Sequence, residues 1–238
     1  MHVLISAAVC PHPPLLVTGI GPERDNELDQ LRDACWSVID ALRSSQPDVL
    51  VVVGSGKTSA PEGPLAGSFA TYGVDRRVAF PGHEQVAAAD MPLSLCVGAW
   101  LLERDGWPGP VVSATVAGGV DGWADSPALG LDIVHQADRV ALLVMTDGSA
   151  SRAAEAPRTF HPRAAEYDAA VCQAIRDGDP QQLLDLDGTL AAEVGSTGAN
   201  VLRAMAGAAS DEVFDAEVLY DSAPYGVGYL VGLWERHG

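Results

Sequence analysis

Polar side chains that could bind a ligand or move a proton follow three apolar runs of the sequence. The runs cover residues 3–9, 48–53 and 140–146, and each is typical of a buried strand. The side chains that follow them are His12, Ser55, Lys57, Asp147, Ser149 and Arg152. In an α/β sheet, ligands bind beyond the carboxyl ends of the strands. We therefore expect these six residues to line one crevice.

The turn that holds His12 is stiff. Pro11, Pro13 and Pro14 surround this histidine, fix their own φ angles at about −65° and bias the preceding residues toward extended backbone. A histidine held in this way loses little conformational entropy when it binds a ligand. The alternative is a turn at the end of a strand whose imidazole makes only a local hydrogen bond. The residue by itself does not decide between the two.

Cys10 and His12 form a C-x-H pair. Residues i and i+2 of an extended segment face the same way, so the pair could be a thiolate with its base or two metal ligands. Because Cys10 ends an apolar run, we favour a role as a buried packing residue.

Two short strings resemble known motifs. Residues 185–189 spell the D-x-D-G-T of haloacid-dehalogenase-type phosphotransferases, but the residues before them predict a helical turn instead of the buried strand this motif needs. We expect Asp187 to cap the next helix. Residues 54–58 end like a P-loop, but position 51 is Val where that motif needs Gly. Neither phosphotransfer nor nucleotide hydrolysis is therefore favoured.

The composition excludes several classes of partner. A formal net charge of −18 over 238 residues disfavours nucleic acid and anionic membranes. No apolar stretch reaches the roughly 20 residues of a membrane span, and no basic leader precedes the first apolar run. No two of the four cysteines form a C-x-x-C pair. Widely spaced cysteines of this kind are typical of reduced thiols. We expect a cytoplasmic protein with neither nucleic acid nor membrane as a partner.

Strand-like runs alternate with helical patterns along the chain, which predicts an α/β fold. Further strands are expected over residues 68–72, 77–80, 111–116, 213–220 and 225–234. Helices are expected over residues 23–44, 93–104, 129–136, 163–176 and 199–208. The first helix has an apolar face formed by Leu28, Leu31, Cys35, Val38, Ile39 and Leu42. No linker or repeat divides the chain, so we expect one domain over residues 1–238.

The order of several segments carries a resemblance to a known family. These segments are the Pro-His-Pro-Pro turn and residues 48–55, 91–95, 144–152, 195–202 and 223–229. Together they resemble the catalytic B subunit of class III extradiol ring-cleavage dioxygenases (the LigB-like superfamily), to which the Memo-like proteins are related. The resemblance implies a three-layer α/β/α domain around a mixed, mostly parallel sheet. In active members it also implies a non-haem Fe(II) held by two histidines and a glutamate.

Only part of the site implied by this resemblance is matched. His12 matches the first iron histidine, whereas the second is expected at residues 54–57, where the chain has Gly-Ser-Gly-Lys. The glutamate falls on or beside Asn200, a neutral amide, and a histidine for acid–base work corresponds to Arg152. His12 and Arg152 are thus the candidate catalytic residues. Asn200 joins the six residues of the crevice as a candidate for ligand binding.

We therefore expect a LigB-like protein with a degenerate iron site that binds a small molecule and needs no cofactor. Lys57 and Arg152 would suit an anionic ligand, and the ancestry would suit an aromatic one. The alternative reading of these two cations is that they face solvent or pair with nearby carboxylates such as Glu62 or Glu155. The chain could also form a homo-oligomer.

Two other functions stay open at this point. The first is an active dioxygenase that uses Fe(II) or another divalent metal in a rebuilt site, with His12, His83, His161 and Asp147 as the ligands. The second is an unrelated hydrolase that uses Cys10 and His12, or the aspartates near residue 185.

Overall fold

The computed structural model describes residues 2–210 and 212–237. The strands are β1 (Val3–Cys10), β2 (Val49–Gly56), β3 (Ala66–Ser68), β4 (Arg77–Ala79), β5 (Val111–Ala117), β6 (Arg139–Met145), β7 (Phe214–Ser222) and β8 (Tyr229–Arg236). The helices are α1 (Asn26–Ser44), α2 (Leu93–Glu103), α3 (Gly119–Trp123), α4 (Ser126–Val134), α5 (Ala164–Asp177), α6 (Pro180–Leu184), α7 (Gly188–Glu193) and α8 (Ala199–Ala209).

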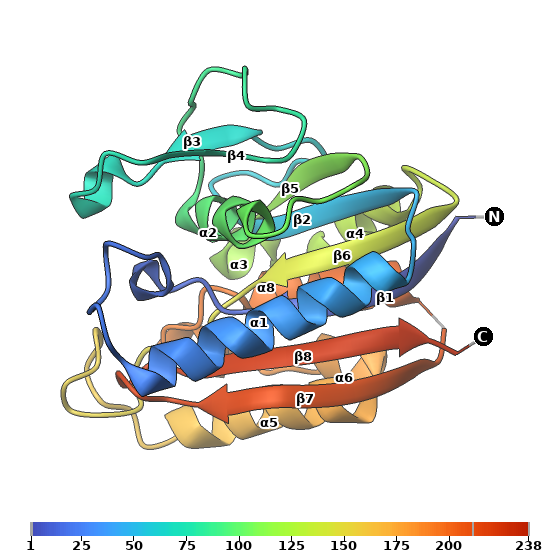
Figure 1. Cartoon of the computed structure of the whole chain (residues 1–238). Coiled ribbons are helices and arrows are strands. Elements are labelled where there is room, and N and C mark those ends of the chain that lie inside the picture. The colour runs from blue at the N-terminus through green and yellow to red at the C-terminus, as the bar shows by residue number, and fades with distance from the viewer. Residues whose placement is uncertain (1, 211, 238) are drawn as a thin grey trace.

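Six of the strands form the central sheet, in the order β5-β2-β6-β1-β8-β7 (Figure 1). The neighbours from β5 to β1 are parallel. β8 runs antiparallel to both β1 and β7. β3 and β4 form a separate two-stranded sheet. The predicted α/β/α fold with a mixed, mostly parallel sheet is confirmed.

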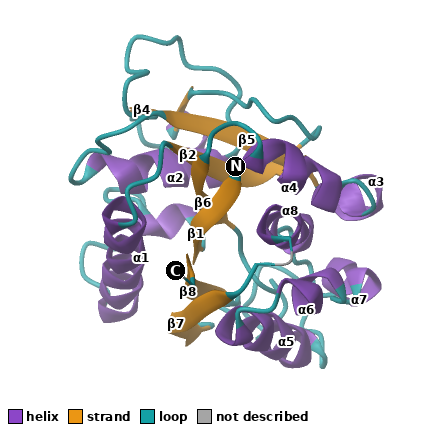
Figure 2. Ribbon diagram, turned by 90° about the vertical axis from the view of Figure 1, so that its right-hand side faces the viewer, coloured by secondary structure: helices purple, strands orange, loops and turns teal. Residues whose placement is uncertain are grey.

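Helices cover both faces of the central sheet (Figure 2). Successive side chains of a strand point to opposite faces, and β2 shows the consequence. Leu50 and Val52 belong to the core layer beneath α1 and α2. Val51 and Val53 belong to the other layer, with α4, α5 and α8. All four side chains are buried, and each contributes about 1.5–3 kcal/mol through the hydrophobic effect. A continuous apolar run is therefore what this strand requires.

The amphipathic helix α1 forms as its sequence predicts. Asp25 caps its first turn by accepting hydrogen bonds from the backbone N–H groups of Glu27 and Leu28, and all six residues of the predicted apolar face are buried. No helix in the described part of the chain is long and apolar enough to span a membrane.

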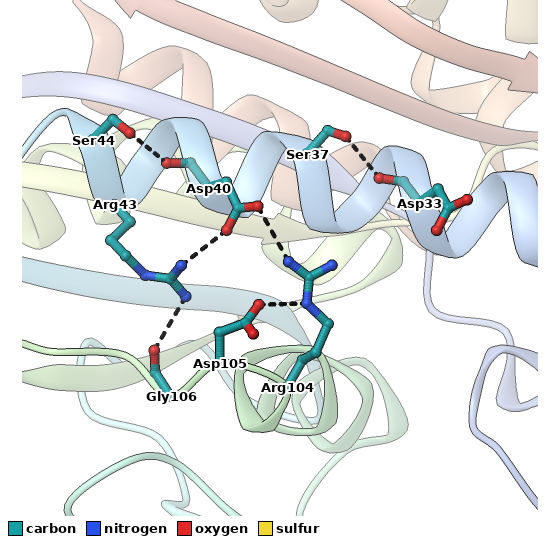
Figure 3. Close-up of polar contacts among 8 residues, drawn as sticks. All are labelled: Asp33, Ser37, Asp40, Arg43, Ser44, Arg104, Asp105 and Gly106. Atoms are coloured by element: carbon teal, nitrogen blue, oxygen red, sulfur yellow. Dashed lines mark hydrogen bonds and ion pairs between the residues drawn. The ribbon is translucent and has the colours of Figure 1, made fainter.

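Polar side chains join α1 to the end of α2 at the surface (Figure 3). Asp40 accepts hydrogen bonds from Arg43 over 2.9 Å and from Arg104 over 3.2 Å. Arg43 also donates to the carbonyl oxygen of Gly106 over 3.1 Å. Exposed ion pairs of this kind contribute little stability, so the buried face of α1 is what holds the helix in place.

Two predicted strands are wrong over part of their length, because these residues form turns. Residues 68–72 were expected to be extended, but Ala70–Tyr72 form a 3-10 turn that ends at Gly73 with φ 81°. Residues 225–228 form a turn, and the final strand begins only at Tyr229. The five-residue helix α3 was not predicted, because a helix this short carries no apolar periodicity.

The carboxyl ends of β1, β2, β5 and β6 meet at one edge of the sheet because these strands are parallel. At this edge the backbone N–H of Thr146 donates to the carbonyl oxygen of Cys10 over 2.9 Å. Cys10 itself is fully buried, as its place in an apolar run predicted. The turn that carries His12 and the loop that follows β6 therefore lie side by side.

Asp187 caps α7, as the sequence predicted. Its carboxylate accepts hydrogen bonds from the backbone N–H groups of Thr189 and Leu190 over 2.9 and 3.0 Å. We expect Asp187→Ala to lower the free energy of unfolding by about 1 kcal/mol, measured by urea denaturation. The control is Asp185→Ala. The Asp185 carboxylate accepts a hydrogen bond from the Gln181 side chain and caps no N-terminus among the described helices, so its loss should change the midpoint little. Equal losses in both variants would contradict the capping role.

Candidate functional site

His12 and Asp147 form the centre of the candidate site. The backbone N–H of His12 donates to Asp147 Oδ1 over 2.8 Å, and His12 Nε2 lies 3.7 Å from Asp147 Oδ2. His12 is only 8% exposed, and its Nδ1 is buried without a hydrogen-bond partner among the described residues. Asp147 is partly exposed. The carboxylate is thus the accessible group, and His12 supports it from within the protein.

One buried carboxylate, Asp168 of α5, holds the loop that follows β6. Its Oδ1 accepts a hydrogen bond from the backbone N–H of Ser149 over 2.7 Å. Its Oδ2 accepts from the Ser149 hydroxyl over 2.7 Å and from Arg152 over 2.8 Å. Gly228 fits against the same group, because a Cβ there would lie 2.4 Å from Asp168 Oδ2. Asp168 therefore positions the loop that carries the aspartate of the site.

Lys57 and Arg152 do not form an unpaired positive site. Arg152 donates to Asp168, whose side chain is 7% exposed. Lys57 lies 3.4 Å from Asp90 in an ion pair whose side chains are 93% and 94% exposed. Both cations pair with carboxylates, which was the alternative reading of the sequence, although the partners are not the expected Glu62 and Glu155. Each of the two cations therefore has a carboxylate partner of its own.

Ser55 and Asn200 use their polar atoms within the protein. The Ser55 hydroxyl donates to the carbonyl oxygen of Thr197 over 2.9 Å. The amide nitrogen of Asn200 donates to the carbonyl oxygens of Ala117 and Gly119 over 2.6 and 2.9 Å. Ser55 therefore ties the end of β2 to the segment before α8, and Asn200 ties α8 to the end of β5 and the start of α3.

The two other histidines of the expected metal site do not join His12. His83 Nε2 lies 3.2 Å from the carbonyl oxygen of Val111, at the amino end of β5 and hence at the opposite edge of the sheet. His161 Nε2 lies 3.8 Å from a carboxylate oxygen of Glu193. Within residues 2–210 and 212–237, no three His, Cys, Asp or Glu side chains come together as metal ligands would. The rebuilt metal site that the sequence left open is not assembled here.

The iron ligands of the resembled family do not fit the residues at the matched positions. The second histidine is expected within residues 54–57, where Ser55 already donates its hydroxyl to the carbonyl oxygen of Thr197 and Lys57 is a cation. Asn200 presents its amide nitrogen to two carbonyl oxygens and carries no negative charge. His12 is the one matching ligand, and a 2-His-1-carboxylate set needs three.

Tyr225 and Tyr229 belong to the site although the sequence did not single them out. With Asp147 they line a pocket of about 340 Å³, and its apolar wall includes Pro13 and Val227. Both tyrosines lie in residues 223–229, which the resemblance had included as a segment. They lie beside Asp147 because β8 pairs antiparallel with β1, and no local sequence pattern predicts this pairing.

The tyrosine hydroxyls of this pocket stay protonated at neutral pH. Burial raises the pKa of Tyr229, and the nearby Asp147 carboxylate raises that pKa further. Burial also raises the pKa of Tyr225 to about 12, together with its hydrogen bond to Asp25. The Tyr225 hydroxyl donates to the Asp25 carboxylate, so the turn before β8 is tied to the start of α1.

Comparison with known proteins supports the fold and no more. No family model matches the chain, and no curated protein matches it. Among solved structures, the chain is similar to the crystal structure of the uncharacterized protein JW3007 from Escherichia coli K12, with a TM-score of 0.56. That similarity covers 97% of this chain and 99% of the other at 12% sequence identity, so it carries no information about activity.

Removal of the Asp168 carboxylate should strongly destabilise the protein. We expect Asp168→Ala to lower the free energy of unfolding by about 3 kcal/mol, because it leaves a buried N–H, a hydroxyl and an arginine without their acceptor. Urea denaturation measures the loss. The matched control on the same helix is Glu166→Ala, which breaks an exposed pair with Arg163 and should leave the midpoint nearly unchanged. Similar midpoints for the two variants would contradict the anchoring role.

Alkaline pH should destabilise the protein through its tyrosines. The folded-state pKa of Tyr167, Tyr220 and Tyr225 is raised to about 12, above the value of about 10 in an unfolded chain. The unfolded chain therefore loses these protons first, so stability is complete below pH ~10 and falls as the pH rises towards ~12. Tyrosinate absorbance should show late ionisation in the folded protein and ordinary ionisation in urea. Identical titration curves in the two states would refute this prediction.

Proposed function

We propose that this chain is a divergent LigB-like protein that binds a small phenolic molecule beside Asp147, without the iron site of the active dioxygenases. The observation that carries the proposal is the Asp147 carboxylate itself. It is ordered by the backbone of His12 and lines a pocket together with Tyr225 and Tyr229. A pocket with apolar walls and a few convergent polar groups is the usual form of a small-molecule site.

The chemistry of the lining residues supports a neutral ligand with hydroxyl donors. Pro13, Pro14 and Val227 offer apolar surface to an aromatic ring. Asp147 is the charged residue among the lining residues, so an anionic ligand would be repelled by it. A phenol instead donates its O–H to the carboxylate in a charge-assisted hydrogen bond. The aromatic preference expected from the sequence is kept, and the anionic preference is replaced.

The resemblance supports the ancestry of this site. The Pro-His-Pro-Pro turn and residues 144–152 lie at the carboxyl ends of β1 and β6, where ligands bind in α/β sheets. Ser55, within the segment expected to carry the second histidine, and Asn200, at the glutamate position, both donate to backbone carbonyl groups. These observations favour a protein that still binds a small molecule at this position but no longer holds iron.

Catechol binding tests the proposal. We expect isothermal titration calorimetry to detect saturable catechol binding that Asp147→Asn weakens about tenfold or more, because a hydrogen bond to a charged group contributes about 1.5–3 kcal/mol. Lys57→Ala is the control and should leave the affinity unchanged, because Lys57 faces solvent with Asp90. Benzoate should bind more weakly than catechol. Tighter binding of benzoate that Lys57→Ala abolishes would restore the anionic ligand and overturn the proposal.

A second measurement separates binding from ring cleavage. Protein supplied anaerobically with Fe(II) and then given catechol and air should consume oxygen no faster than Fe(II) and catechol alone. Oxygen uptake that depends on the protein and is lost in His12→Ala would show an active dioxygenase instead.

A further inference from the structure

A second pocket, separate from the one beside Asp147, lies among α3, α7 and the first turn of α8. Its volume is about 510 Å³, within the range of roughly 300–1,000 Å³ typical of ligand sites. These three helices lie on the same face of the central sheet (Figure 2). The pocket has no part in the proposed phenol site, whose lining residues are different.

The walls of this pocket are largely apolar, and its aromatic side chain is packed against a neighbouring arginine. Small side chains such as Ala124 and Ala192 line it together with Trp123 and Val120, and Val120 is 88% exposed. The indole ring of Trp123 is held from outside the pocket: the Arg203 guanidinium lies 4.2 Å from the ring centroid. A fixed aromatic edge between small apolar residues suits a flat ring.

Asn200 supplies a hydrogen-bond acceptor to the pocket that no described residue uses. It lines the pocket and is 3% exposed. Its amide nitrogen makes both of its bonds to the carbonyl oxygens of Ala117 and Gly119, which fixes the orientation of the amide. The Oδ1 atom then has no donor among the described residues. An acceptor that lines a pocket and has no protein donor is available to water or to a ligand.

The charge of the pocket is negative. Glu193 is the charged residue among its lining residues, and its side chain is half exposed, 3.8 Å from His161. The lining residues include no lysine or arginine. Among the lining side chains, an occupant therefore meets the Asn200 amide oxygen and the Glu193 carboxylate as acceptors, and no lysine or arginine.

We propose that this pocket binds an aromatic amine that also carries a ring N–H. The ring lies among the apolar walls, its N–H donates to Asn200 Oδ1, and the ammonium group pairs with Glu193. Tryptamine has these three features and is the probe. 1-Methyltryptamine lacks only the ring donor, and indole-3-acetate reverses the charge of the side chain.

Calorimetric titration with these three compounds tests the assignment. We expect saturable tryptamine binding, a loss of about fivefold or more with 1-methyltryptamine because a hydrogen bond contributes about 1 kcal/mol, and no saturable binding of indole-3-acetate. Saturable binding of indole-3-acetate with equal affinity, or no binding of tryptamine, would overturn the proposal.

Variants then locate the site. Glu193→Gln should weaken tryptamine binding several-fold, and Ala192→Leu, at an exposed position of α7, should block the pocket without disturbing the core. The matched control Glu155→Gln removes an exposed carboxylate outside the pocket and should change nothing. Asp147→Asn should also leave tryptamine binding intact, which separates this site from the phenol site. Loss in Asp147→Asn with none in Glu193→Gln would refute the assignment.

Discussion

The buried carboxylate of Asp168 is the interaction on which the candidate site depends. It joins α5 to the loop after β6 through Ser149 and Arg152, and the turn before β8 closes against it at Gly228. A buried carboxylate is stable only when its oxygens are satisfied, and here an N–H, a hydroxyl and a guanidinium satisfy them. The same contacts hold Asp147 next to His12. The geometry of the site therefore depends on how the buried Asp168 carboxylate is neutralised and hydrogen-bonded.

That charge balance also decides what the site can bind. Arg152 is the cation that could have drawn an anion into the crevice, and Asp168 already neutralises it. Lys57 lies at the protein surface, in an ion pair with Asp90. The carboxylate of Asp147 is left as the charge that faces the pocket, in a chain whose formal net charge is −18. Ser55 and Asn200 direct their polar atoms to backbone carbonyl groups, so the charge of the site comes from Asp147.

Much of the fold could be predicted because the burial of residues in β2 and α1 follows from local periodicity. The alternating layers of β2 and the apolar face of α1 were both expected, since a strand between two helical layers must be apolar throughout and a surface helix needs one apolar face. The Asp187 cap was expected for the same local reason. The prediction failed at residues 70–72 and 225–228, where turns replaced expected strands and the apolar character of the segment was the weaker signal.

The amino-acid sequence was sufficient to place His12 on a stiff turn at a strand end, and to show that no histidine stands at residues 54–57. Tertiary structure decided which partner each polar group takes. Arg152 meets Asp168 sixteen positions further along the chain, and Tyr229 reaches Asp147 because an antiparallel strand is added beside β1. Such pairings depend on how helices and strands pack in space, and residue spacing along the chain carries no record of them.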